Sequence, residues 1–387
     1  MQYREDKASG NQLSMLGMGC MRFPGNKAET ERMILAAIRG GVNFFDTAYI
    51  YPGSEKTLGD ILARHKKREE VYIATKLPLL MCKSTEDFDR FFDEQLKRLK
   101  TGYIDYYFLH SITDYKQWDK FRALGLDDWL AKKKKAGLIR NVGFSFHGTC
   151  DDFLKILVDY AWGFCMIQYN YYDENYQAGR RGLEAAARGG VSVMVMEPLL
   201  GGRLATGLPK EAVHIFEKAV PGRPPAEWAL HWLWNQPEVT VVLSGMSSTD
   251  VLEKNLKAMD NLNPNEDTNA PVYAAVIEEF RKSYKINCTG CNYCLPCPMG
   301  INIPACFSAY NTRYAQGFIT GMTLYMTSTA AIRKETASPR KCNHCGKCEK
   351  NCPQYIPIRK ALKKVAGKME PLPVRALLAL VRRVMPR

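Results

Sequence analysis

The sequence predicts an α/β protein, with a parallel (β/α)₈ TIM barrel followed by a smaller, mainly helical domain. Three observations carry this prediction. Short β-rich runs alternate with amphipathic stretches over about 270 residues. A polar residue ends most of these runs. After residue 285 the chain becomes rich in cysteine and in basic residues, which indicates a domain of another kind. A doubly wound sheet is the alternative for the first part.

Seven strands are expected in the first part, with helices between them such as 29–40 and 88–100. The strands are Gly41–Asp46, Val71–Lys76, Ile104–His110, Asn141–Phe146, Cys165–Tyr169, Ser192–Glu197 and Val239–Ser244. Polar residues stand at or near the C-terminal ends of six of them: Asp46, Lys76, His110, Ser145, Gln168 and Glu197. Barrel enzymes collect catalytic groups from many strand ends, so this pattern favours the barrel over the open sheet. The nearest match to a dinucleotide loop, Gly17-Met-Gly19-Cys20, lacks the third glycine and carries no weight.

Charge and cysteine content divide the chain of 387 residues into two predicted domains, 1–285 and 286–387. The net charge is +14, and residues 286–387 hold 16 basic and 3 acidic residues, a balance of +13. Eight of the 13 cysteines lie in two short windows, a spacing that suits a metal or cluster and a reducing, cytoplasmic compartment. We expect neither a transmembrane helix nor a secretory signal, because no apolar run reaches 18 residues and the first ten residues lack an apolar core.

Four strand-end residues form a proton-transfer set: Asp46, Tyr51, Lys76 and His110. The pKa of a free tyrosine, about 10, is too high for efficient acid–base catalysis at neutral pH. A nearby ammonium group favours phenolate, and Lys76 can serve in this way if Asp46 holds it charged. His110 can donate a hydrogen bond to a carbonyl oxygen.

These residues and their spacing resemble the aldo–keto reductase family over about residues 10–260. The matching motifs are Gly41-Val-Asn-Phe-Phe-Asp46-Thr-Ala-x-x-Tyr51, the Lys76 and His110 strand ends, Gly143-Phe-Ser145, Gln168-x-x-Tyr171, Pro198-Leu-Leu-Gly-Gly202 and Ser244-Gly-Met-Ser-Ser with Asn255. The resemblance implies a barrel that binds NADP(H) or NAD(H) across its mouth. It implies that Tyr51 is the acid–base group, that Lys76 tunes it, that Asp46 pairs with Lys76, and that His110 orients the substrate. Ser145, Gln168, Ser244, Gly245, Ser247 and Asn255 are the expected cofactor-binding residues.

The cofactor half departs from the family pattern at three positions. Phe146 replaces an asparagine, Met196 stands where an aromatic residue stacks on nicotinamide, and Ser247 stands where an arginine often binds a 2′-phosphate. The choice between NADH and NADPH is therefore left open.

The two cysteine windows match the ligand runs of [4Fe–4S] clusters. The second reads Cys342-Asn-His-Cys345-Gly-Lys-Cys348-Glu-Lys-Asn-Cys352-Pro, the run of bacterial ferredoxins, and the first holds Cys288, Cys291, Cys294 and Cys297. Because each fourth cysteine ligates the other cluster in such domains, Cys352 is paired with the first triplet and Cys297 with the second. Zinc is the alternative, and the shorter first window leaves open that only one cluster forms. Helices are expected over 303–316 and 318–329, which resembles helical ferredoxin modules fused to oxidoreductases.

The two domains together predict an oxidoreductase that reduces an aldehyde or ketone with NAD(P)H, its clusters serving electron transfer or structure. The alternative is a ferredoxin-linked electron-transfer module whose barrel binds another substrate or cofactor. A redox sensor without enzymatic activity is a third possibility, which the intact Asp/Tyr/Lys/His set opposes. The basic second domain favours docking of an acidic electron carrier, ferredoxin or flavodoxin, over nucleic acid. The alternative is that these charges are simply solvated and compensate the negative charge of the clusters. The last predicted helix, from Pro373, is basic and leucine-rich; it could lie on an anionic membrane or pack as a terminal helix.

Overall fold

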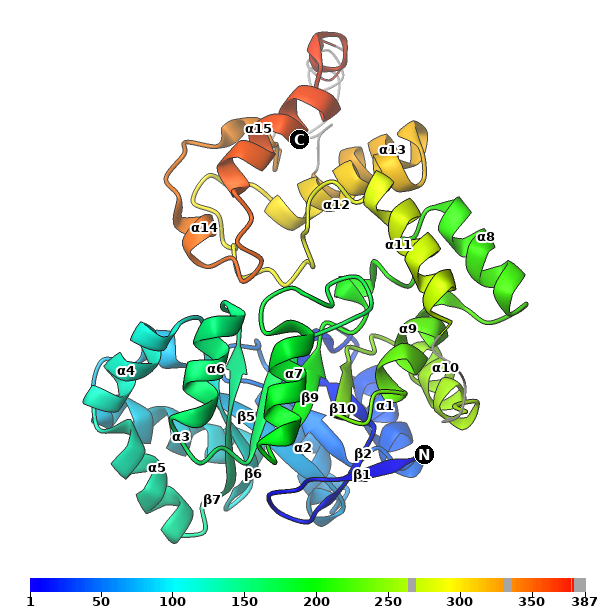
Figure 1. Cartoon of the computed structure of the whole chain (residues 1–387). Coiled ribbons are helices and arrows are strands. Elements are labelled where there is room, and N and C mark those ends of the chain that lie inside the picture. The colour runs from blue at the N-terminus through cyan, green and yellow to red at the C-terminus, as the bar shows by residue number, and fades with distance from the viewer. Residues whose placement is uncertain (264–268, 330–335, 377, 379–387) are drawn as a thin grey trace. The chain divides into compact units, whose positions relative to one another are not determined.

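The structure is a computed structural model that describes residues 1–263, 269–329, 336–376 and 378 (Figure 1). Its contacts divide the chain into two compact units. The first comprises Met1–Pro198 and Ala229–Thr268, and the second comprises Leu199–Trp228 and the part from Asn269 onward. Both units are therefore discontinuous in sequence, whereas the predicted boundary at residue 285 is a single cut.

The first unit is built around a closed barrel of parallel strands, which confirms the predicted fold class. Its strands are β3 (Leu16–Gly19), β4 (Phe44–Asp46), β5 (Tyr72–Leu77), β6 (Ile104–Ile112), β7 (Ile139–Phe146), β8 (Phe164–Gln168), β9 (Ser192–Met196) and β10 (Val239–Ser244). Each strand pairs with the next along the chain, and β10 pairs with β3 to close the ring. All seven predicted strands are present, and their ends differ from the predicted ones by at most three residues.

The sequence did not predict the first barrel strand, β3, because it is short and contains two glycines. Close packing favours glycine at position 17. A Cβ atom at Gly17 would lie 2.7 Å from Val241 Cγ1 and 2.8 Å from Leu243 Cδ2, both on the neighbouring strand β10. The glycine-containing segment is thus part of the barrel wall.

Helices surround the strands of the barrel (Figure 1). They are α1 (Lys27–Arg39), α2 (Ser54–Arg64), α3 (Thr85–Leu99), α4 (Tyr115–Ala123), α5 (Leu126–Lys135), α6 (Cys150–Val158), α7 (Gly179–Arg188) and α10 (Thr249–Asp260). Helix α9 (Pro225–Trp234) begins in the second unit and ends in the first. Trp228, Trp232 and Trp234 of α9 are buried, so these indoles are part of the packed core.

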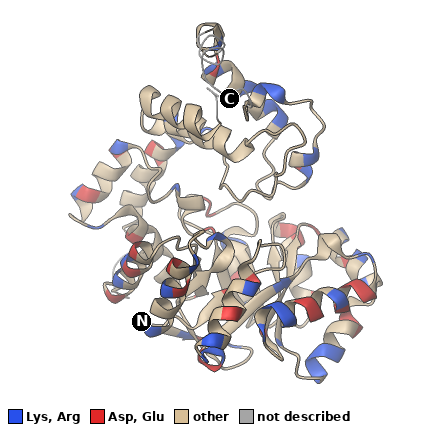
Figure 2. Cartoon of the chain, turned by 180° about the vertical axis from the view of Figure 1, so that it is seen from behind, with Lys and Arg blue, Asp and Glu red and all other residues tan. Residues whose placement is uncertain are grey.

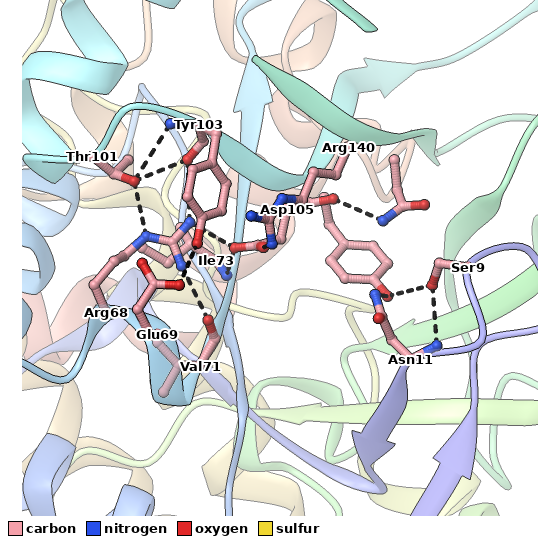
Figure 3. A network of polar contacts seen from close by, with 12 residues as sticks. Ser9, Asn11, Arg68, Glu69, Val71, Ile73, Thr101, Tyr103, Asp105 and Arg140 are labelled. Atoms are coloured by element: carbon pink, nitrogen blue, oxygen red, sulfur yellow. Dashed lines mark hydrogen bonds and ion pairs between the residues drawn. The ribbon is translucent and has the colours of Figure 1, made fainter. Parts of the chain in front are cut away.

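The N-terminal end of the barrel is closed by a hairpin, β1 (Tyr3–Glu5) and β2 (Gln12–Ser14), and by a polar network (Figure 3). The buried Asp105 carboxylate accepts hydrogen bonds from Arg68 at 2.7 Å, from Arg140 at 3.1 Å and from the Ile73 N–H at 3.0 Å. A buried carboxylate with three donors remains compensated away from water. In a barrel this end serves stability, while the opposite end carries chemistry.

The second unit is mainly helical. Its helices are α8 (Lys210–Ala219), α11 (Ala270–Ser283), α12 (Ile303–Ala315), α13 (Phe318–Ser328), α14 (Lys347–Lys350) and α15 (Ile358–Met369). The expected helices over 303–316 and 318–329 are confirmed by α12 and α13. Phe307, Tyr310, Tyr325, Leu362 and Val365 form the centre of its apolar core. Most of the predicted helix that starts at Pro373 lies outside the described residues. Among the described helices, none is both long and apolar enough to cross a membrane.

Candidate active site and cluster sites

The structure brings the four residues of the predicted proton-transfer set together at the C-terminal end of the barrel strands. Lys76 on β5 donates hydrogen bonds to Asp46 Oδ1, at the end of β4, at 2.5 Å and to the Thr47 carbonyl at 2.7 Å. The same ammonium nitrogen lies 5.1 Å from the ring centroid of Tyr51, which follows β4 in the turn before α2. The ring of His110, on β6, stands edge-on to Tyr51 with centroids 6.1 Å apart.

Burial dominates the electrostatics of this group. Burial lowers the pKa of Lys76 and raises the pKa of Asp46, while their mutual attraction opposes both shifts. Burial, followed by the nearby Lys76 and His147, lowers the pKa of His110 well below its ordinary value. His110 is therefore a neutral imidazole at neutral pH, with one N–H to donate.

Tyr49, two residues before Tyr51, has a different environment. Its hydroxyl donates to Glu94 at 2.7 Å and its ring packs edge-on against Phe91 of α3. Burial and the Glu94 carboxylate raise the pKa of Tyr49. Tyr49 therefore packs against the helices outside the barrel.

Sequence reasoning missed a buried carboxylate that supports the Tyr51 turn. Glu55, in the first turn of α2, accepts hydrogen bonds from Thr75 at 2.6 Å, Gln95 at 2.8 Å and Arg98 at 3.1 Å. Thr75 precedes Lys76 on β5, so this network joins the start of α2 to the strand that carries the lysine. In the sequence, only its position four residues after Tyr51 marks Glu55, and a glutamate at such a position is common.

Two predicted cofactor-binding residues end adjacent strands and are held by other side chains. Ser145 on β7 accepts a hydrogen bond from the Ser111 N–H at 2.8 Å. Gln168, the last residue of β8, donates through Nε2 to Asp173 at 2.9 Å. Phe146, where the family has asparagine, packs edge-on against Phe153 of α6, and so belongs to the helix-facing layer.

Asp173 is a second buried carboxylate that the sequence did not single out. The side chain of Asn170 accepts the Asp173 N–H at 2.9 Å, and its own amide donates to the Glu197 carbonyl at 3.0 Å. Burial raises the pKa of Asp173 to about 6, against the opposing hydrogen bond from Gln168. The sequence feature that could have indicated this group is the polar residue Asn170 just after the end of β8.

The other predicted cofactor-binding residues follow β10. Ser244 ends this strand, and its hydroxyl accepts a hydrogen bond from Asn255 of α10 at 2.8 Å. Both side chains are buried. Gly245 and Ser247 lie in the turn between β10 and α10. Asn255 is thus joined to Ser244 across this turn, within the barrel unit.

The first cysteine window encloses a cavity within the second unit. Within the described ranges, no three His, Cys, Asp or Glu side chains lie close enough to hold a single metal ion. Cys288, Cys291 and Cys294 instead line a cavity together with Cys352 from the second window. Apolar side chains line the rest of it, among them Ile303, Phe307 and Ile356. Three cysteines from one window and a fourth from the other fit the ligand set expected for one [4Fe–4S] cluster.

The second window is more open. Cys345 is exposed, Cys342 and Cys348 are half-buried, and Cys297 is also half-buried. Cys297, Cys342 and Cys348 pack against the same apolar core. Of the five single cysteines, Cys20, Cys82, Cys165 and Cys306 are buried and Cys150 is half-buried.

Comparison with known proteins assigns both parts of the chain. Residues 15–272 match the aldo/keto reductase family, and residues 287–356 match the 4Fe-4S dicluster domain. The aldo-keto reductase of Mycobacterium sp. (strain JLS) is 30% identical over 155 residues, which are 39% of this chain and about half (51%) of that relative. L-glyceraldehyde 3-phosphate reductase of Escherichia coli (strain K12) is 26% identical over 311 residues, 68% of this chain and 88% of that protein.

A solved structure agrees with the barrel assignment. The holo form of aldo-keto reductase AKR11C1 from Bacillus halodurans superposes with a TM-score of 0.60 at 25% identity, over 72% of this chain and 96% of that one. The matched family region is two thirds of the sequence. The chain is therefore an oxidoreductase of the aldo/keto reductase family, with a 4Fe-4S dicluster domain after its barrel.

Proposed function

We propose that the barrel reduces an aldehyde or ketone with NADPH or NADH, using Asp46, Tyr51, Lys76 and His110. The observation that carries this proposal is the buried Lys76–Asp46 pair beside the Tyr51 ring, with a neutral His110 edge-on to the same ring. A charged lysine, a phenol and a neutral imidazole close together can transfer a proton to a carbonyl oxygen.

Each of the four side chains has a separate task in this proposal. Tyr51 donates its hydroxyl proton to the carbonyl oxygen as that oxygen gains charge. The Lys76 ammonium stabilises the phenolate that Tyr51 leaves behind, because a nearby positive charge favours the ionised form. Asp46 holds Lys76 charged against the cost of burial. His110 donates its N–H to the carbonyl oxygen and so fixes the substrate in line with Tyr51.

The residues at the C-terminal ends of β7, β8 and β10 fit a nicotinamide cofactor. When bound, that cofactor supplies the hydride. Ser145 and Gln168 would hold its carboxamide, and Asp173 fixes the Gln168 amide for this contact. Ser244, Gly245, Ser247 and Asn255 would hold the rest. Met196 and Ser247 offer neither an aromatic face nor a cation, so NADH and NADPH are both candidates.

Two [4Fe–4S] clusters complete the proposal. Cys288, Cys291, Cys294 and Cys352 would hold the first, supported by their shared cavity. Cys342, Cys345, Cys348 and Cys297 would hold the second. When bound, such clusters transfer electrons one at a time. A nicotinamide gives up two electrons together as a hydride, so the two groups do not exchange electrons directly. The role of the clusters is therefore structural or in electron transfer to the barrel.

The high positive charge of residues 286–387 supports a second candidate function, a ferredoxin-linked electron-transfer module. In this function an acidic carrier delivers electrons to the clusters, and the barrel binds another substrate or cofactor. Opposite charge accelerates the encounter of two redox proteins, which gives the basic residues a use that carbonyl reduction alone does not.

An anaerobic assay separates the two functions. NADPH and NADH oxidation is measured with short aldehydes, including glyceraldehyde 3-phosphate, before and after cluster removal. Turnover that persists without clusters and is lost in Tyr51→Phe supports carbonyl reduction. Cluster reduction by ferredoxin with no nicotinamide oxidation by any aldehyde would instead support the electron-transfer module.

A further inference from the structure

The two cysteine windows differ in charge. Residues 287–300, which contain the first window, include no Lys, Arg, Asp or Glu. Residues 340–364, which contain the second window and most of α15, include eight Lys or Arg and one acidic residue, Glu349. Figure 2 shows this contrast as basic residues gathered on α15 and the loop before it. The positive charge of the second unit is therefore concentrated around one window.

The single acidic residue near the second window is neutralised by an ion pair. Arg359, at the start of α15, binds Glu349 of α14 at 2.7 Å, and its backbone N–H donates to the same carboxylate at 2.8 Å. This contact joins α15 directly to the second window. Lys347 and Lys350 flank Cys348, are exposed, and form no ion pair with the described residues.

Helix α15 extends the basic surface beyond the window. Its buried face consists of Ile358, Leu362, Val365, Ala366 and Met369, which pack into the apolar core. A helix with one apolar face presents the remaining positions to water. Those positions hold Lys360, Lys363 and Lys364, all exposed. The lysines of α15 and the two lysines beside Cys348 form what we call the basic rim: Lys347, Lys350, Lys360, Lys363 and Lys364.

The cysteines of the two windows differ in exposure in the same direction as charge. Cys345 of the second window is exposed, as are its neighbours Asn343 and His344. At the first window Asn292 and residues 298–300 are also exposed, but Cys288, Cys291, Cys294 and Cys297 are all half-buried. Electron tunnelling weakens steeply with distance, so a docked protein exchanges electrons fastest with the group nearest the surface.

We propose that the basic rim docks an acidic one-electron carrier protein, and that electrons pass between this carrier and the cluster held by the second window, not the first. The inference rests on the proposed clusters and names the surface and partner of that site. Charge complementarity selects a carrier with an acidic face. The exposed cysteine segment beside the rim favours a redox protein over a lipid surface, which would need only the charge.

The test measures how fast a reduced acidic ferredoxin reduces the clusters of the full-length, anaerobically prepared protein. Lys347→Glu/Lys350→Glu and Lys360→Glu/Lys363→Glu should each lower the second-order rate constant at least tenfold at low salt and flatten its salt dependence. The matched control is Lys134→Glu/Lys135→Glu on α5, which makes the same change in net charge at exposed lysines of the barrel. Its rate should stay within about twofold of the unmodified protein.

Two further measurements make every outcome decisive. Photoreduction by an uncharged deazaflavin should be equally fast in all these proteins, which shows that their clusters are loaded and reducible. Cys345→Ser should stop ferredoxin from reducing the first cluster while deazaflavin still reduces it. Equal rate losses in rim and control variants, or salt-independent reduction, would overturn the proposal.

Two other outcomes would also overturn it. In the first, the rim variants lose binding to anionic phospholipid vesicles while ferredoxin reduces their clusters at an unchanged rate. This result would show that the basic rim binds a membrane surface. The other is unimpaired reduction of the first cluster by ferredoxin in Cys345→Ser. A different result would count against the proposed function itself: either the protein contains no iron and sulfide, or no aldehyde causes it to oxidise NADPH or NADH.

Discussion

Replacement of Asp173 by asparagine should stabilise the barrel at neutral pH. The Asp173 carboxylate is 7% exposed and accepts a hydrogen bond from Gln168 at 2.9 Å. In Asp173→Asn the side-chain oxygen can still accept this bond, while the buried negative charge is removed. The variant therefore isolates the free-energy cost of burying the charge.

The magnitude follows from the pKa of Asp173, which burial raises from 3.8 to about 6. Between these pH values the folded state keeps a proton that the unfolded state has released. The unmodified protein therefore loses stability as pH rises from about 4 to about 6, and the loss stays above that range. At about 1.4 kcal/mol per pKa unit, the cost is about 3 kcal/mol at pH 7.5 and about 1.5 kcal/mol at pH 5.

Anaerobic unfolding, followed by tryptophan fluorescence at pH 5 and pH 7.5, measures this difference. A gain of about 3 kcal/mol corresponds to a rise of roughly 6–12 °C in the Tm of a unit of this size. Asp151→Asn is the control, because Asp151 is 74% exposed in its ion pair with Arg181 and should shift Tm little. A stability difference between variant and unmodified protein that is the same at both pH values, or a less stable variant at pH 7.5, would refute the reasoning.

Three further predictions concern the proposed chemistry and clusters. Tyr51→Phe should lower carbonyl reduction at least about 10²-fold with an unchanged circular dichroism spectrum, while Tyr49→Phe should stay close to the unmodified rate; equal activity of the first variant would reject the proton-donor assignment. Lys76→Met should abolish turnover and lower the Tm, because Asp46 loses its buried partner, and persistent activity with the same pH profile would show that Lys76 does not act on Tyr51. Anaerobic protein should contain about eight iron and eight sulfide per chain; about four, unchanged in Cys297→Ser, would contradict the second ligand set.

The sequence was sufficient to predict the barrel and the positions of Asp46, Tyr51, Lys76 and His110 because both depend on local order. A strand that ends in a polar residue fixes where that residue lies once parallel strands close into a ring. Asp46, Lys76 and His110 therefore meet at one end of the barrel without any knowledge of packing. Tyr51 lies five residues after Asp46 in the segment that follows the same strand, so its position near Lys76 could also be predicted from the spacing.

What the sequence did not predict depends on contacts between distant residues. The two glycines of β3 suggest a loop until Val241 and Leu243 of the neighbouring strand are placed against Gly17. The raised pKa of Asp173 arises from burial, which no local pattern encodes. The grouping of Leu199–Trp228 with the C-terminal part likewise rests on long-range packing, such as Gly201 against Thr289.

The discontinuous second unit has a consequence for synthesis on the ribosome. Phe216 of α8 stacks on Trp228 and contacts Tyr273 of α11, so α8 needs α11 to cover its apolar face. Helix α11 ends at Ser283, 64 residues after α8 ends at Ala219. At roughly 5–20 residues per second, α8 waits about 3–13 s for its partner. During that interval the apolar face of α8 that α11 covers in the folded protein stays exposed, and exposed apolar surface of this kind promotes aggregation.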